Sequence, residues 1–341
     1  NDKHISFQVI KRVQQMDAID EGMVDREKDP AHRAGTVYHM AGIIPVAGHQ
    51  SDFGFQWDNV LMPVGENYTA IERSVRECAT AGCHTIWIVC NPDISPLIRD
   101  RVGEGVHDPL RYGYARRYDP IPQNSQQMIP IYYVPIAAKD IGRIDCYAWS
   151  IIHGAVTAWE TSKEVSKWVT PEKYFVSFPL GVHNSFSKIK KARGDIRKKG
   201  ANWFLTHNGK TAKDGEHLSF SISGKDLVEC RKVIRAGTGK YLPGLTYEEL
   251  TSDKEDWEKS YPLEERWSAR HFSLDKVLEP VIIEGAKLLE ASWYYDITTW
   301  YGYTRYFGER SRTTKRPTNG AMKHHVWHGL GVDDEKDDNE E

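Results

Sequence analysis

The residues best placed to do chemistry lie between Gly48 and Asn59, directly after a short apolar run. Gly48 and Gly54 allow a backbone to approach a ligand closely, and successive main-chain N–H groups can hold an anion. Asp52 and Asp58 make the same segment acidic, and two carboxylates repel a phosphate unless a metal ion intervenes. We interpret this segment as a candidate site for a phosphate-bearing ligand. The alternative is that the glycines only form turns.

A second candidate is the basic run Lys188–Lys199, which holds seven cations and a single acid, Asp195. Such a run can contact a polyanion or a protein partner, and the alternative is a solvated helix face. Aromatic side chains crowd Trp293–Tyr306. They suit a sugar-binding face or the interface of a homo-oligomer, and they could equally seal the edge of the core.

The composition excludes several classes of protein. Lys and Arg number 45 and Asp and Glu 48, so the formal charge of −3 argues against general nucleic-acid binding. The longest apolar stretches, Ala41–Ala47 and Thr85–Cys90, are shorter than the roughly 20 residues that a membrane span needs. Five cysteines without CxxC spacing favour free thiols. With no signal-peptide pattern at the start, we expect no membrane span and a cytoplasmic location.

Hydrophobic patterning predicts the elements that position these residues. A buried strand begins at Met40, a helix covers Asn67–Ala81 with Gly82 as its cap, and His84–Cys90 forms a second, parallel strand. A long helix is predicted from Ser273, with one apolar stripe that reaches Leu289. Further helices are predicted at Asp93–Val102, Ile144–Glu160, Asp226–Ile234, Tyr247–Ser260 and Thr299–Phe307, and further strands at Ile129–Val134, Lys173–Phe178, Asn202–Thr206, His217–Ile222 and Trp293–Ile297.

This alternation of strands and helices predicts an α/β three-layer sandwich with a mainly parallel, mixed sheet. We expect one domain over residues 40–310, preceded by an N-terminal extension, residues 1–39. Within the domain we expect a surface insertion at about 103–128 and a basic segment at 186–213. The last residues, 311–341, form a tail whose acidic end is expected to be disordered.

A series of runs along the chain has a further meaning. Ile43–Gly48 is followed by Val60–Gly65, and a helix ending at Gly82 then leads into the strand Ile86–Val89. The later runs are Tyr133–Ala158, His271–Val277 and Tyr295–Tyr303. Together these runs resemble the sugar nucleotidyltransferases, which make NDP-sugars from an NTP and a sugar 1-phosphate on a GT-A-type Rossmann fold.

The resemblance implies a nucleotide-diphospho-sugar transferase-like fold that binds an NTP and a sugar phosphate. Asp296 stands where the family has a metal-binding aspartate, which implies Asp296 as a ligand of Mg²⁺. Gly142 stands where the family binds the base and the sugar. The residues implied around the phosphates are Ala47, Gly48, His49, Gln50 and Gly54.

The chain also departs from the family pattern. The loop after the first strand has no Lys or Arg, and Asn59 stands about where the family has a lysine. The run Phe175–Gly181, which corresponds to the strand with the first metal-binding aspartate, has no carboxylate. A rebuilt catalytic site would therefore use Asp52 and Asp58 as new Mg²⁺ ligands, with Asn59 beside them and cations from the basic run.

The leading hypothesis is transfer of NMP from an NTP to a sugar 1-phosphate or a related phosphate, with release of pyrophosphate. The contrasting hypothesis is an inactive descendant of the fold that serves as a structural or assembly protein. A third is a GT-A glycosyltransferase that uses an NDP-sugar. That class normally has a DxD-like pair at a strand end, and the one candidate pair, Asp337-Asp338, is in the tail.

Overall fold

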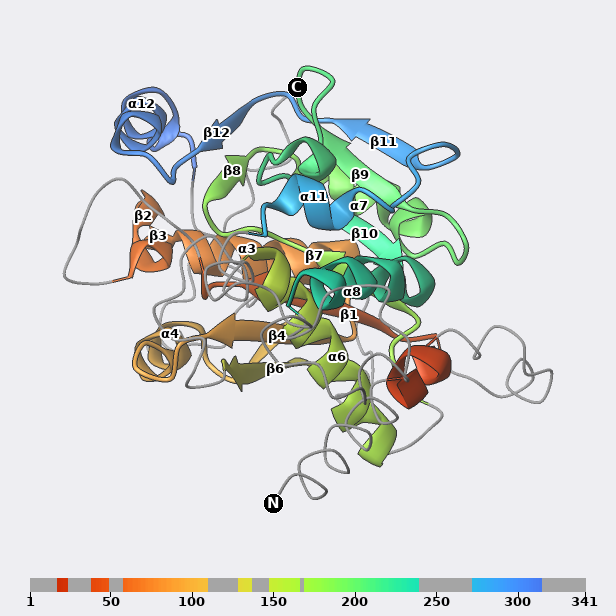
Figure 1. Ribbon diagram of the computed structural model, residues 1–341. Helices are drawn as coiled ribbons and strands as arrows, with labels where there is room; N and C mark the ends of the chain where they lie inside the picture. The colour runs from red at the N-terminus through yellow and green to blue at the C-terminus, as the bar shows by residue number, and fades with distance from the viewer. Residues whose placement is uncertain are drawn as a thin grey trace, which may run out of the picture.

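The computed structural model describes residues 17–23, 38–48, 58–109, 128–136, 147–165, 169–238 and 272–314. An eight-stranded sheet runs through the described part in the order β11-β9-β10-β7-β1-β4-β6-β5 (Figure 1). The adjacent strands β7, β1, β4 and β6 are parallel, as are β9 and β11, and the other pairs are antiparallel. The strands are β1 Met40–Pro45, β4 Thr85–Cys90, β5 Gly105–His107, β6 Met128–Pro135, β7 Lys173–Val176, β9 Trp203–Thr206, β10 Phe220–Ser223 and β11 Lys287–Glu290.

Helices cover both faces of the sheet. Successive residues of β1 point to opposite sides, and all of them are buried, so both faces need a covering layer. Met40 and Ile44 pack into one apolar cluster, together with α3 Ala70–Ala81, α4 Ser95–Val102, α7 Phe186–Ile196 and α12 Trp300–Arg310. Ala41 and Ile43 pack into the other, with α6 Tyr147–Val165, α8 Gly224–Thr238, α11 Leu274–Leu278 and the helical residues 17–23. This arrangement confirms the predicted α/β three-layer architecture with its mainly parallel, mixed sheet.

Smaller elements lie beyond the strand ends. The pairs are β2 Pro63–Gly65 with β3 Tyr68–Thr69 and β8 Gly181–His183 with β12 Tyr294–Asp296, and the short 3-10 helices are η2 Asn59–Leu61 and η5 Ala212–Asp214. Figure 1 shows β12 and α12 together at one end of the molecule. No helix within the described ranges combines the length and the apolar character that crossing a bilayer would demand.

Local sequence signals explain the elements that were predicted correctly. Thr69 and Glu72 form a capping box at the start of α3, and Gly82 ends the helix at φ 92°. Strand β1 precedes this crossover helix in the chain and β4 follows it, and the two strands pair in parallel. Asn208 and Gly209, both at positive φ, make a tight turn after β9 that is closed by the bridge between His207 and Lys210.

The long helix predicted from Ser273 to Leu289 is wrong. The helix ends at Leu278, Pro280 lacks the N–H that a further turn needs, and Gly285 adopts a φ of 78°. Lys287–Glu290 instead forms β11, which pairs with β9 at the edge of the sheet. The surface insertion predicted at 103–128 is wrong at its start, because Gly105–His107 is the edge strand β5. The helix predicted at 247–260 lies outside the described residues.

Candidate functional site

The carboxyl ends of β1, β4 and β7 meet at a turn that follows β1. The N–H groups of Val46 and Ala47 both donate to the carbonyl of Val89 at 2.9 Å, and Gly48 then adopts a φ of 88°. The first turn of α6 lies against this loop, since the Ser150 hydroxyl donates to the Ala47 carbonyl at 2.6 Å. The start of the described part of α6 therefore lies beside the turn at the carboxyl ends of β1 and β4.

Asp296 lies on β12, which pairs with β8 so that Asp296 faces Gly181 in the register. Its Oδ1 accepts the N–H of Thr298 at 2.9 Å and lies 3.4 Å from Nδ1 of His217. Burial raises the pKa of this carboxyl, but the contacts with His217 and Thr298 outweigh it and the pKa is lowered. The carboxylate is therefore ionised at neutral pH, and its side chain is 38% exposed.

Tyr147, the first residue of α6, packs against His217. Its ring lies 5.0 Å from the ring of His217, centroid to centroid. Burial raises the pKa of the Tyr147 hydroxyl well above its usual value, and the charges of Asp296 and Asp58 raise it further. These contacts place Asp296, His217 and Tyr147 in one row of neighbours from three distant segments of the chain.

Asp58 and Asn59 have clear structural roles. Oδ1 of Asp58 accepts the N–H of Val60 at 3.0 Å and caps the short helix η2, while Asn59 is buried. The other residues predicted for this site, His49, Gln50, Asp52, Gly54 and Gly142, lie outside the described residues and stay predictions.

Sequence reasoning missed His217, Tyr147 and Thr298. His217 precedes β10, and its N–H donates to the Tyr294 hydroxyl at 3.0 Å. A single histidine at the start of a predicted strand carries no spacing signal, and Tyr147 resembles any apolar position of a covered helix. Their roles follow from contacts across the fold.

The fit of Mg²⁺ depends on the oxygens that the chain offers. Among the described residues there is no cluster of three or more His, Cys, Asp or Glu side chains able to hold a metal. Mg²⁺ is commonly held by one or two carboxylates together with substrate phosphates and water. The partly exposed, ionised Asp296 fits that mode, in which the nucleotide supplies most of the oxygen ligands. It does not fit a site built from protein ligands alone.

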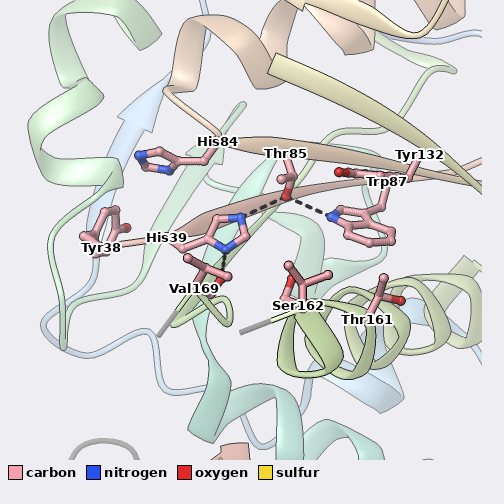
Figure 2. Close-up of a pocket in the computed structure, with 10 residues that line it drawn as sticks. Tyr38, His39, His84, Thr85, Trp87, Tyr132, Thr161, Ser162 and Val169 are labelled. Carbon is pink, nitrogen blue, oxygen red and sulfur yellow. Dashed lines mark hydrogen bonds between the residues drawn. The ribbon is translucent and has the colours of Figure 1, made fainter. Parts of the chain in front are cut away.

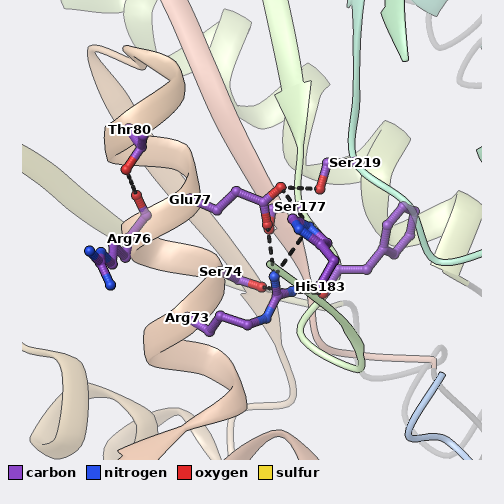
Figure 3. Close-up of polar contacts among 9 residues, drawn as sticks. Arg73, Ser74, Arg76, Glu77, Thr80, Ser177, His183 and Ser219 are labelled. Carbon is purple, nitrogen blue, oxygen red and sulfur yellow. Dashed lines mark hydrogen bonds and ion pairs between the residues drawn. The ribbon is translucent and has the colours of Figure 1, made fainter. Parts of the chain in front are cut away.

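A buried polar network is centred on Glu77 of α3 (Figure 3). Glu77 on α3 is buried and lies 3.1 Å from Arg73 and 3.1 Å from Nε2 of His183. The hydroxyls of Ser177, at 2.7 Å, and Ser219 also donate to its carboxylate. Burial raises the pKa of Glu77, but the contacts with His183, Arg73 and Ser219 lower it to about 2. The network joins α3 to the segments that follow β7 and precede β10.

Much of the basic run serves the fold. Arg193 makes two contacts with the carboxylate of Asp108, at 2.9 and 2.5 Å, and Lys199 pairs with Glu172 at 2.5 Å. Lys188 donates to the Glu290 carbonyl at 2.9 Å. Lys190, Lys191 and Lys198 are exposed, and a polyanion partner at these lysines stays a proposal.

The aromatic segment divides into buried and exposed members. Tyr306 is buried and its hydroxyl donates to the Val64 carbonyl, while the Tyr303 hydroxyl donates to that of Pro63 at 3.1 Å. These two tyrosines fasten α12 to β2, which agrees with the alternative that the aromatic residues seal the edge of the core. Trp300 and Tyr301 are 49% and 74% exposed. A sugar or a second subunit at these two residues is untested.

Gly181, the register partner of Asp296, lies close to the backbone of His217. A Cβ at Gly181 would lie 1.8 Å from the carbonyl oxygen of His217. We expect Gly181→Ala to cost about 2 kcal/mol or more of unfolding free energy, because the backbone must move. Gly194→Ala, on the surface of α7 with no atom within 4 Å, should stabilise by about 0.5 kcal/mol. Urea unfolding measures both, and equal effects would refute the crowding at Gly181.

Comparison with known proteins gives two findings. No protein-family model matches the chain, and no curated protein does. Among solved structures, a Bacillus anthracis protein assigned as a glucose-1-phosphate thymidylyltransferase, in complex with sucrose, is similar with a TM-score of 0.46 and 11% identity. That match covers 82% of this chain and 97% of the other. A UDP-glucose pyrophosphorylase complexed with UDP-glucose is similar with a TM-score of 0.46 and 10% identity, over 80% of this chain and 98% of the other.

Proposed function

We propose that this protein binds a nucleoside triphosphate and a sugar phosphate at the carboxyl ends of β1, β4 and β7 and transfers the nucleotidyl group between them. The observation that supports the proposal is the contact of the ionised Asp296 with His217, whose ring packs on Tyr147 in the same helix, α6, that contacts the loop after β1 through Ser150. In open α/β sheets, ligands bind outside the carboxyl ends of the strands. The runs that resemble sugar nucleotidyltransferases include this loop and Asp296.

In the proposed reaction an oxygen of the sugar phosphate attacks the α-phosphorus of the NTP. The bond from that phosphorus to the bridging oxygen of the β-phosphate breaks, and pyrophosphate leaves with the electron pair. Asp296 would hold Mg²⁺ together with the phosphates, and the ion would neutralise their charge. His217 keeps the Asp296 carboxylate ionised and in place. Gly48 and the start of α6 would lie against the phosphates, with Gly142 near the base or sugar.

A second candidate function is binding without catalysis, in a structural or assembly role. Ser177 directly follows β7, within the run where the resemblance leads one to expect a metal-binding aspartate. Its hydroxyl donates to the buried Glu77 at 2.7 Å, so this position is part of the core. Transfer of a nucleotidyl group relies on neutralising charge in the transition state, and a lost metal ligand weakens that neutralisation.

The test measures binding and chemistry separately. Each of the four NTPs with Mg²⁺, and a set of NDP-sugars, is added to the protein and the melting temperature is followed. Pyrophosphate release is then measured with a panel of sugar 1-phosphates. A melting shift with pyrophosphate release supports the transferase, and a shift without release supports the binding protein. No shift with any NTP or NDP-sugar would rule out nucleotide binding at this site.

A further inference from the structure

A cavity lies at the end of the central strands opposite to the Gly48 loop, and Figure 2 shows the residues that line it. Its volume is about 250 Å³. His39 directly precedes β1, and Thr85 is the first residue of β4 and faces Ala41 in the register. The six residues of β1 therefore separate this cavity from the Gly48 loop by roughly 20 Å. The cavity is distinct from the proposed nucleotide site.

The cavity has an aromatic wall. Trp87 on β4 and Tyr132 on β6 are register partners, and their rings stack with centroids 4.3 Å apart at 22°. Trp87 is almost fully buried, whereas Tyr132 is 41% exposed. Val165, at the end of α6, and Val169 also line the cavity and are exposed. Large apolar side chains thus gather at its rim, where water otherwise covers them at a cost in free energy.

The polar groups of the cavity form a hydrogen-bonded chain. Nδ1 of His39 contacts the carbonyl of Val169, which can only accept, so Nδ1 carries a proton; with Nε2 unprotonated, that nitrogen is the acceptor of the chain. The Thr85 hydroxyl then donates to Nε2 at 3.0 Å and accepts the indole N–H of Trp87 at 2.9 Å. Each of these groups has a partner within the protein, so the chain does not require a charged ligand.

The rest of the lining agrees with a neutral ligand. Among the described lining residues there is no Lys, Arg, Asp or Glu, and burial, with the charge of Arg197, lowers the pKa of His84 to about 4. The Tyr38 hydroxyl is buried and has no hydrogen-bond partner among the described residues. A phosphate would find no cation among the described lining residues.

We propose that this cavity binds a neutral, planar aromatic molecule of one or two fused rings. The size agrees, because a dry apolar cavity of roughly 150 Å³ holds benzene. A flat ring can pack against the exposed surface of Tyr132, whose other side Trp87 supports, and stacking adds to the gain from apolar burial. The site is independent of the nucleotide site in its position and in the chemistry of its ligand.

Indole is the probe for the experiment, with binding to the whole chain followed by saturation-transfer NMR and calorimetry. We expect wild-type protein to bind indole and to bind indole-3-carboxylate at least about tenfold more weakly, since the described lining holds no cation. Thr161→Trp places a large side chain at an exposed lining position of α6 and should weaken indole binding about tenfold or more.

Glu164→Trp is the matched control, because Glu164 is exposed on the same helix and does not line the cavity. It should bind indole within twofold of wild type. Val165→Trp is a second blocking variant at a lining position that is 79% exposed, so a folding defect in one variant leaves the test intact. Absence of indole binding to the wild type, or equal loss in Glu164→Trp, would overturn the proposal. Any nucleotide-induced melting shift should be the same in all these variants.

Discussion

Replacing Asp296 by Asn is expected to abolish the Mg²⁺-dependent rise in melting temperature that an NTP gives to the wild-type protein. The amide keeps the shape of the carboxylate and an oxygen that can accept the N–H of Thr298. It loses the negative charge that a hard divalent cation requires. A ligand at 100 times its Kd stabilises by about 2.7 kcal/mol, which raises the melting temperature of a domain by several degrees.

Two controls accompany this variant. Asp195→Asn removes a carboxylate from an exposed position of α7 and should leave the nucleotide response unchanged. Without nucleotide, Asp296→Asn should unfold close to the wild-type temperature, because the carboxylate is partly exposed. An unchanged Mg²⁺ response in Asp296→Asn would remove this residue from the site, whatever the protein binds elsewhere.

Replacing Glu77 by Met is expected to have the largest effect on stability, about 3 to 5 kcal/mol. The side chains of Glu77 and Arg73 are 0% and 1% exposed, so the variant leaves the Arg73 charge buried without its carboxylate. It also leaves His183, Ser177 and Ser219 without a shared acceptor. Urea unfolding at pH 7 measures the loss, with circular dichroism to follow the fold.

The double variant Arg73→Met with Glu77→Met separates the ion pair from simple packing. Removing both charges should cost clearly less than the sum of the two single variants, because neither charge is left alone in the core. Arg73 also donates to the Phe178 carbonyl at 2.6 Å, so some loss should persist. Additive effects, or single variants that each cost less than about 1 kcal/mol, would contradict the coupling.

The same network predicts a dependence on pH. The pKa of Glu77 is about 2 in the folded protein, and an unfolded Glu titrates near 4.3. Because the folded pKa is the lower one, the stabilisation is complete above about pH 4.5 and is lost as the pH falls toward 2. Glu77→Met should therefore lose less stability than the wild type between pH 5 and pH 3. An equal loss would assign the acid sensitivity to other groups.

The accuracy of the sequence predictions depended on whether a signal was local. The helix α3 could be predicted because its apolar period and the Gly82 cap lie within one short segment. The segment after Ser273 had a helical apolar period too, yet Leu288 and Leu289 belong to a strand. The pairing of β11 with β9 overrode that period once Pro280 had interrupted the helix. Periodicity alone could not anticipate a partner strand.

The sequence by itself determined the α/β class, the central βαβ unit and the acidic character of the loop after β1, because these depend on residues close together in the chain. Only the tertiary structure decided that Asp296 contacts His217 and that His217 packs on Tyr147. It also decided that Trp87 stacks on Tyr132. Contacts of this kind depend on strand order and register, which arise when distant segments pack together, and no spacing within one segment records them.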